Sequence, residues 1–145
     1  MDTIKLKNPV ELVIGSTGIT SDTKEVVGEV KKLKDKDPKR FDSIIKEYLQ
    51  IVSQGRQALE KADLILVGKL MDKNHKLLQD ITVSNAVLDK MVEIARKAGA
   101  VGAKLTGTGR GGNMIALTPG TKLRDKVASA LQSAGYEVWK TTIGA

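Results

Sequence analysis

A glycine-rich stretch in the second half of the chain restricts its fold more than any other feature. Four of the 14 glycines lie within residues 107–112, in the pattern G-x-G-x-x-G. Glycine permits positive φ angles and leaves backbone amides bare, so successive N–H groups can form a concave site for phosphate. The apolar run that follows, residues 114–117, ends before Pro119 and is too short for a helix. The stretch therefore predicts a loop between two strands.

Two well-known kinds of glycine loop do not fit this context. A dinucleotide-binding loop needs a helix directly after its glycines. The protein kinases need V-A-I-K, H-R-D and D-F-G motifs, and the sequence contains none of the three. Two alternatives stay open from the residues alone, a glycine-rich turn in a structural hairpin and a phosphate-facing loop. The candidate residues of such a loop are Gly107, Thr108, Gly109, Arg110, Gly111 and Gly112.

The amino-acid composition excludes several classes of functional site. A chain of 145 residues with 41% hydrophobic residues predicts a single domain, 1–145, with a substantial core. It has no cysteine and one histidine, His75, which excludes thiolate metal sites, cysteine nucleophiles and a histidine metal cluster. A lone histidine on a helix is more typical of a packed or capping residue than of a catalyst. We find no apolar run near 18 residues and no signal-peptide core, so we expect a cytoplasmic protein without a membrane partner.

The net charge of +7 raises nucleic acid as a partner, but its distribution argues against one. Six basic residues fall within 31–40, where Asp35 and Asp37 interrupt them, and aromatic residues that could stack on bases are scarce. We interpret this segment as a solvated linker between helices and expect no nucleic acid. The excess positive charge also suits a small anionic substrate.

The apolar pattern predicts strands at 11–15, 103–105, 113–118 and 136–142, and helices in between. The expected helices begin after Ser21 or Asp22 and after Asp37, and others cover 64–78, 86–98 and 121–134. The predicted fold class is therefore α+β, a four-stranded antiparallel or mixed sheet backed by helices, with a ferredoxin-like β-β-α-β tail. Thr23 would stand at a helix N-terminus, where the nearby hydroxyl groups either cap the helix or contact an anion.

Four pieces of the sequence, in order, resemble the GHMP kinases (galactokinase, homoserine, mevalonate and phosphomevalonate kinases). Residues 102–117, GAKLTGTGRGGNMIAL, resemble the third motif of the family and are most similar to its mevalonate kinase branch, whose pattern is roughly GAKLTGAGGGGCxIAL. Residues 22–27 resemble S-T-K-x-L-V, and residues 70–78 resemble L-M-N-x-N-H-x-L-L. Residues 88–100 resemble the helix that precedes the glycine motif.

The resemblance implies the C-terminal lobe of a two-lobed enzyme that transfers the ATP γ-phosphoryl group to mevalonate in isoprenoid synthesis. The N-terminal lobe of such kinases carries a P-x-G-S-G-L-G-S-S-A loop that holds ATP and Mg²⁺, and these 145 residues contain no such stretch. We therefore expect no catalytic residue and no metal ligand in this chain. We also expect little activity without the N-terminal lobe as a partner, and some self-association through the exposed face.

By the same resemblance, Thr23 and Thr106 would contact the substrate, and the glycine loop would close against the phosphates. The chain differs from the commonest family pattern at Thr108, Arg110 and Asn113. Arg110 would either pair with a phosphate or carboxylate or point into water. Two alternative functions are a non-catalytic module that binds a small molecule and the lobe of another GHMP kinase, such as phosphomevalonate kinase.

Overall fold

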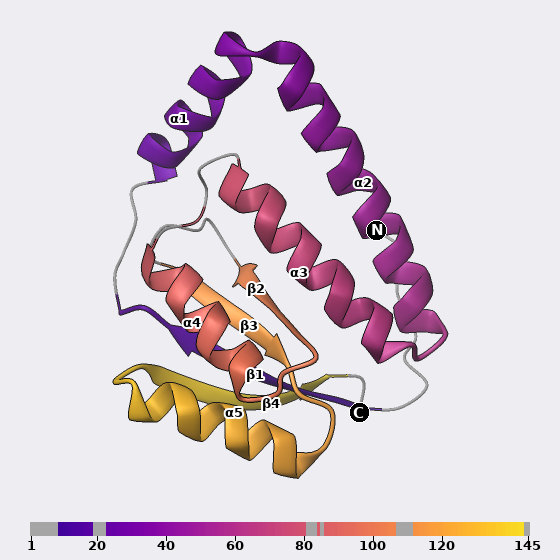
Figure 1. Ribbon diagram of the computed structural model, residues 1–145, viewed down its shortest axis with the longest axis vertical. Coiled ribbons are helices and arrows are strands. Elements are labelled where there is room, and N and C mark those ends of the chain that lie inside the picture. Colours follow the sequence, from indigo (N-terminus) through magenta and orange to yellow (C-terminus); the bar gives the residue numbers. More distant parts are fainter. Residues whose placement is uncertain (1–8, 19–22, 81–83, 85, 107–111, 144–145) are drawn as a thin grey trace.

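The computed structural model describes residues 9–18, 23–80, 84, 86–106 and 112–143, and the side chains of residues 23–26 are outside this description. Figure 1 shows the arrangement of the helices and strands. In chain order the elements are β1 (Val10–Ser16), α1 (Thr23–Lys36), α2 (Pro38–Glu60), α3 (Leu64–Asp80), α4 (Ala86–Lys97), β2 (Gly102–Thr106), β3 (Asn113–Leu117), α5 (Thr121–Ser133) and β4 (Glu137–Ile143).

The four strands form one sheet in the order β2-β3-β1-β4, and every neighbouring pair is antiparallel. With α4 before β2 and α5 before β4, this is the ferredoxin-like arrangement, and α1, α2 and α3 are additional helices between β1 and α4. The α+β prediction is thus confirmed. The predicted helix end at Gly99 is also confirmed, because this glycine has a φ of 110° and its N–H donates to the Arg96 carbonyl.

One face of the sheet is sealed by α4 and α5 (Figure 1). Strand residues alternate between the faces, so Val13, Ala103, Leu105, Met114 and Ala116 all point to this side. They meet a set of helix residues that is also fully buried: Leu88, Met91, Val92, Ala95, Val127, Ala128 and Leu131. At about 25 cal/mol per Å² of apolar surface, this dry layer is a large contribution to stability.

The opposite face of the sheet is covered only in part, by α2 and α3. Val10, Leu12 and Leu117 pack there against Ala58 of α2 and Val67 of α3. Helix α3 lies along α2 and beside the edge strand β2, whereas α1 contacts α2 and stands away from the sheet in Figure 1. In the part of the chain that the structure describes, no helix is long and apolar enough to cross a membrane.

Two details of the sequence interpretation are wrong. Residues 31–40 are not a linker, because α1 runs to Lys36 and α2 starts at Pro38. Asp37 alone separates them and caps α2, since its carboxylate accepts a hydrogen bond from the Arg40 N–H (3.1 Å). The local hydrogen bond and the proline at the first helical position are sufficient to start the second helix without a linker.

The predicted buried stripe of α2 is narrower than expected, and Gly55 does not interrupt the helix. Ile44 and Ile51 are buried as predicted, but Leu49 and Val52 are 60% and 52% exposed. The reason is that α3 packs along one side of α2 and leaves the adjoining apolar positions uncovered. Leu66 of α3, expected on the buried face, is likewise exposed.

Candidate functional site

The ends of β1 and of the β2–β3 hairpin meet at one end of the sheet. Strand pairing places Asn113 opposite both Ser16 and Thr106. Beyond the pair, the backbone N–H and the hydroxyl of Thr17 both donate to the Gly112 carbonyl, at 3.3 and 3.0 Å. The fold therefore brings Thr17, which follows β1, next to Gly112 at the end of the glycine-rich stretch, although the two residues are 95 positions apart in sequence.

Several predicted site residues lie outside the described part of the chain, namely Gly107, Thr108, Gly109, Arg110 and Gly111. Of the described ones, Thr106 ends β2 and Gly112 accepts the hydrogen bonds from Thr17. Thr23 is the first residue of α1, the helix that follows the hydroxyl-rich segment, and its side chain is outside the description. The contacts of these residues with a substrate or phosphate stay predictions.

A second polar arrangement holds α3 against the open edge of β2. The backbone N–H groups of Ala103 and Leu105 point away from β3, where an edge strand would leave them without partners. The Asp72 carboxylate accepts from the Ala103 N–H (3.0 Å), and Nδ1 of His75 accepts from the Leu105 N–H (3.1 Å). Arg96 completes the contact by donating to Asp72 (2.8 Å) and to the Ala103 carbonyl (3.1 Å). Side chains of α3 thus replace a neighbouring strand.

His75 has a structural role in this arrangement. Its Nδ1 accepts from a backbone N–H, so the neutral ring carries its proton on Nε2 and donates it to Asp89 (2.9 Å). Burial lowers the pKa of His75, and this outweighs the opposing effect of the Asp89 carboxylate. Ser84 donates its hydroxyl to Asp89 (2.7 Å) instead of to the histidine. His75 therefore does not activate Ser84 as a nucleophile.

Asp89 is held in its charged form. Burial raises the pKa of Asp89, but hydrogen bonds from Ser84, Gln79 and His75 outweigh burial and leave that pKa below its ordinary value. Together, Asp89 of α4 and His75 of α3 connect two helices to the edge strand. Asp72 and Asp89 lie in segments that we compared with the GHMP kinases, but we assigned neither residue a role from the sequence. The spacing of Asp72 and His75, three residues apart on one helix face, is the signal that could have linked Asp72 to His75.

Close backbone contact makes the packing of α3 against β2 possible. A Cβ built on Gly68 would lie 2.3 Å from the Val101 carbonyl oxygen, and one on Gly102 would lie 2.3 Å from the Gly68 carbonyl oxygen. Both distances are shorter than side chains tolerate, so each glycine is sterically required. This contact sets the distance between α3 and the edge of the sheet.

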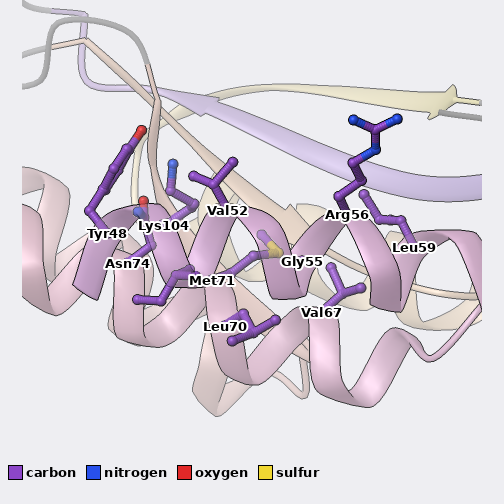
Figure 2. A pocket seen from close by; sticks show the side chains of 11 residues that line it. Tyr48, Val52, Gly55, Arg56, Leu59, Val67, Leu70, Met71, Asn74 and Lys104 are labelled. Atoms are coloured by element: carbon purple, nitrogen blue, oxygen red, sulfur yellow. The ribbon is translucent and has the colours of Figure 1, made fainter. Parts of the chain in front are cut away.

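A cavity of about 330 Å³ lies between α2, α3 and β2. Aliphatic side chains form most of its wall, and Figure 2 shows Tyr48, Asn74 and Lys104 together at one end. Burial lowers the pKa of Lys104, which points to the face of the sheet opposite α4. The described ranges contain no group of three or more His, Cys, Asp or Glu residues that could hold a metal ion.

Comparison with known proteins agrees with this architecture. Residues 56–137, more than half of the chain, match the family described as GHMP kinases C terminal. The segment begins in α2 and ends at the start of β4, so it includes α3, α4, the β2–β3 hairpin and α5. The chain belongs to the GHMP kinase C-terminal family.

Individual relatives point to one branch of this family. Over 129 residues, 86% of this chain, it is 40% identical to a mevalonate kinase from Pyrococcus horikoshii, of which it covers 38%. A crystal structure of L. major mevalonate kinase in complex with R-mevalonate superimposes with a TM-score of 0.92 and 39% identity, covering 97% of this chain and 44% of that one. A phosphomevalonate kinase from Streptococcus pneumoniae shares the fold at 18% identity, with a TM-score of 0.85. The chain thus spans less than half the length of these relatives, 38–44%.

Proposed function

We propose that this chain acts as the C-terminal lobe of a mevalonate kinase, which transfers the γ-phosphoryl group of ATP to mevalonate and yields 5-phosphomevalonate. The similarity to mevalonate kinases at 39–40% identity over most of the chain carries the proposal. The likeness to the phosphomevalonate kinase, at 18% identity, supports the shared fold alone. ATP and Mg²⁺ would be bound mainly by an N-terminal lobe, in the cytoplasm.

The contact between Thr17 and Gly112 supports a site at this end of the sheet. It joins Thr17, which follows β1, to Gly112 at the end of the glycine-rich stretch, and Thr106 ends the strand that precedes this stretch. In the proposed reaction Thr23 and Thr106 would contact mevalonate, and residues 107–112 would approach the phosphates. Phosphoryl transfer depends on positioning and on neutralising charge around the γ-phosphoryl group. A lobe that supplies only part of that environment would show little activity alone.

The test is ADP release from Mg-ATP with R-mevalonate, measured for this chain alone and mixed with the N-terminal lobe of a mevalonate kinase. We expect activity only in the mixture, and a loss of about 10²-fold in the mixture with Thr23→Ala, typical of removing one positioned group. Thr23→Ser, which keeps the hydroxyl, should retain most of the activity. Activity of the chain alone would contradict the proposed division between lobes.

The same assay with 5-phosphomevalonate decides between the two kinase branches. Turnover of phosphomevalonate but not of mevalonate would assign the chain to the other branch. Binding of mevalonate without turnover in any mixture would identify a non-catalytic module instead. Sedimentation across the micromolar range tests the expected self-association, because a single monomeric species throughout would contradict it.

A further inference from the structure

The two edges of the sheet differ in whether their backbone groups have partners. At β2, side chains of α3 accept hydrogen bonds from the outward N–H groups of Ala103 and Leu105. At the other edge, β4 pairs with β1 from Glu137 to Ile143 and lies at the border of the sheet (Figure 1). Among the residues that the structure describes, no group hydrogen-bonds to the outer side of β4. A regular edge strand of this kind can pair with a further strand.

The strand register shows which backbone groups of β4 point outward. The Thr118 N–H donates to the Glu11 carbonyl (3.1 Å), so Glu11 and the other odd-numbered residues of β1 direct their backbone groups to β3. Because this direction alternates along a strand, the even-numbered residues of β1 bond to β4, where their partners are odd-numbered. Trp139, opposite Ile14, is one of these partners. The outward N–H and C=O groups therefore belong to the even-numbered residues of β4: Val138, Lys140 and Thr142.

Two exposed apolar side chains accompany this open edge. Trp139 is 47% exposed and Ile143 is 41% exposed. Both lie on the partly covered face of the sheet, since Ile143 is opposite Val10, which packs there against α2 and α3. Thr141 lies midway between them on the same face. The pattern is symmetric about Thr141, so an antiparallel copy centred there would place Trp139 of each chain opposite Ile143 of the other. Aromatic and β-branched cross-strand pairs of this kind stabilise a sheet.

The charge and the hydrogen-bonding groups of β4 also fit this register. Lys140 would be opposite Thr142 of the second copy, and the two residues would exchange backbone hydrogen bonds through their outward groups. The Lys140 ammonium group lies 3.0 Å from the Asp125 carboxylate of its own chain, on the side of α5. Moving the centre to Lys140 would place two like charges directly opposite each other, which is destabilising. Moving it to Trp139 would leave Ile143 beyond the paired residues. The register centred on Thr141 is therefore favoured over both neighbours.

We propose that β4 is a docking surface for a second copy of this chain, whose own β4 adds antiparallel to it about a two-fold axis at Thr141. The interface is isologous, because each copy supplies the same outward groups and the same two apolar side chains. The two sheets join into one, with α4 and α5 of both copies on the same side. This surface does not depend on the proposed kinase activity, and it gives the expected self-association a definite place and register.

The first experiment is sedimentation velocity of the full chain from the micromolar to the millimolar range, where we expect a monomer–dimer equilibrium. Thr142→Pro removes an outward N–H and leaves the bonds between β4 and β1 intact, so the dimer should weaken by about tenfold or more. The matched control is Thr142→Ala, which keeps the N–H and should dimerise as the unchanged chain does. A single monomeric species throughout, or equal dimerisation of the proline and alanine variants, would overturn the proposal.

Cross-linking tests the register directly. The chain contains no cysteine, so each single-cysteine variant has one thiol. Thr141→Cys would face its counterpart in a non-hydrogen-bonded pair, where Cα atoms are about 4.5 Å apart and a disulfide can form. With diamide as oxidant, it should form covalent dimers at least about tenfold faster than Ser53→Cys, an exposed control on α2, because pairing raises the effective concentration of the thiols. Fastest cross-linking of Trp139→Cys or Lys140→Cys would overturn the proposed register.

Circular dichroism separates a lost interface from a lost fold. At low concentration the spectrum of Thr142→Pro should match that of Thr142→Ala, because the N–H that proline removes has no partner among the described residues. If the proline variant does not fold, the cross-linking of Thr141→Cys decides the proposal, since that substitution keeps every backbone group. A rate of cross-linking for Thr141→Cys no higher than that of the Ser53→Cys control would then overturn it.

Discussion

The two faces of the sheet differ in how completely helices cover them. Under α4 and α5, strand and helix side chains meet in a layer from which water is excluded. Under α2 and α3, the contact is limited to one end of the sheet and leaves a cavity. Adjacent residues of β2 illustrate the contrast, because Leu105 is fully buried on the first face and Lys104 lines the cavity on the second.

Because of this difference, the two faces of the sheet contribute unequally to the stability of the fold. The sealed face has uniform apolar packing, where any loss of volume leaves a void. The other face keeps a buried, unpaired side-chain oxygen on Asn74 and the half-buried ammonium group of Lys104, and α2 has Gly55 where alanine would favour the helix. One layer therefore holds the fold together, and the other retains features that contribute little to its stability. The predictions below test this contrast, from the largest expected effect to the smallest.

The largest difference in stability is expected when leucine is replaced by alanine in the sealed layer and, for comparison, at an exposed position of α2. Leu131→Ala, in the sealed layer, should lower the free energy of unfolding by about 2–5 kcal/mol, because it removes buried surface and leaves a cavity. Leu49→Ala, at a 60% exposed position of α2, should change it by at most about 0.5 kcal/mol. Urea unfolding followed by circular dichroism measures both. Similar losses for the two variants would contradict the contrast between the layers.

Two glycines provide the next comparison. Gly68→Ala should destabilise the fold by about 1–3 kcal/mol, because its Cβ would overlap the Val101 carbonyl and force α3 away from β2. Gly55→Ala should stabilise it by up to about 1 kcal/mol, since alanine favours the helix and the space is open. The two changes are chemically identical and lie on the neighbouring helices α2 and α3. Effects of the same sign in urea unfolding would argue against the packing described for one of them.

The smallest effect concerns pH. Burial lowers the pKa of His75 in the folded chain, so below its ordinary value of 6.5 the unfolded chain binds more protons than the folded one. The contribution of neutral His75 to the free energy of unfolding is therefore fully present above pH 6.5. It decreases as the pH falls through the lowered pKa of the folded chain. Each unit of lowering corresponds to about 1.4 kcal/mol. The free energy of unfolding should thus be smaller at pH 5.5 than at pH 7.5.

His75→Gln is the control for this pH dependence. Its amide can accept from Leu105 and donate to Asp89 without titrating, so the difference between the two pH values should shrink. The lowered pKa of Asp89 acts at more acidic pH, below the carboxylate's ordinary value of 3.8, in both chains. Identical pH dependence in the variant and the unchanged chain would mean that His75 does not carry the effect.

Local patterns were sufficient for most elements. Apolar spacing predicts the four strands and their intervening helices, and the glycine at residue 99 ends a helix as expected, because these signals act between neighbours in sequence. The exposure of Leu49 and Val52 was not predictable in this way. Their spacing is helical and apolar, but burial depends on whether another element packs on that side of α2.

The residues of the candidate site likewise differ in whether the sequence alone could identify them. The glycine cluster and its flanking residues, Thr106 and Gly112, were identified from sequence, because a glycine-rich turn between strands has a local signature. The contact of Gly112 with Thr17 was not identified, since it joins residues 95 positions apart. The role of His75 also required the structure, because its partners come from α4 and β2.

The sequence by itself therefore determined the element order, the α+β class and the family to which the chain belongs, because motifs and periodicity are properties of short segments. Only the tertiary structure decided which sheet face is sealed, how α3 replaces a strand at the edge of β2, and where a cavity remains. The physical reason is that burial and hydrogen-bond satisfaction depend on what approaches from elsewhere in the chain. Lys104 and Leu105 are neighbours in sequence, yet packing gives one a place at a cavity wall and the other a place in the core.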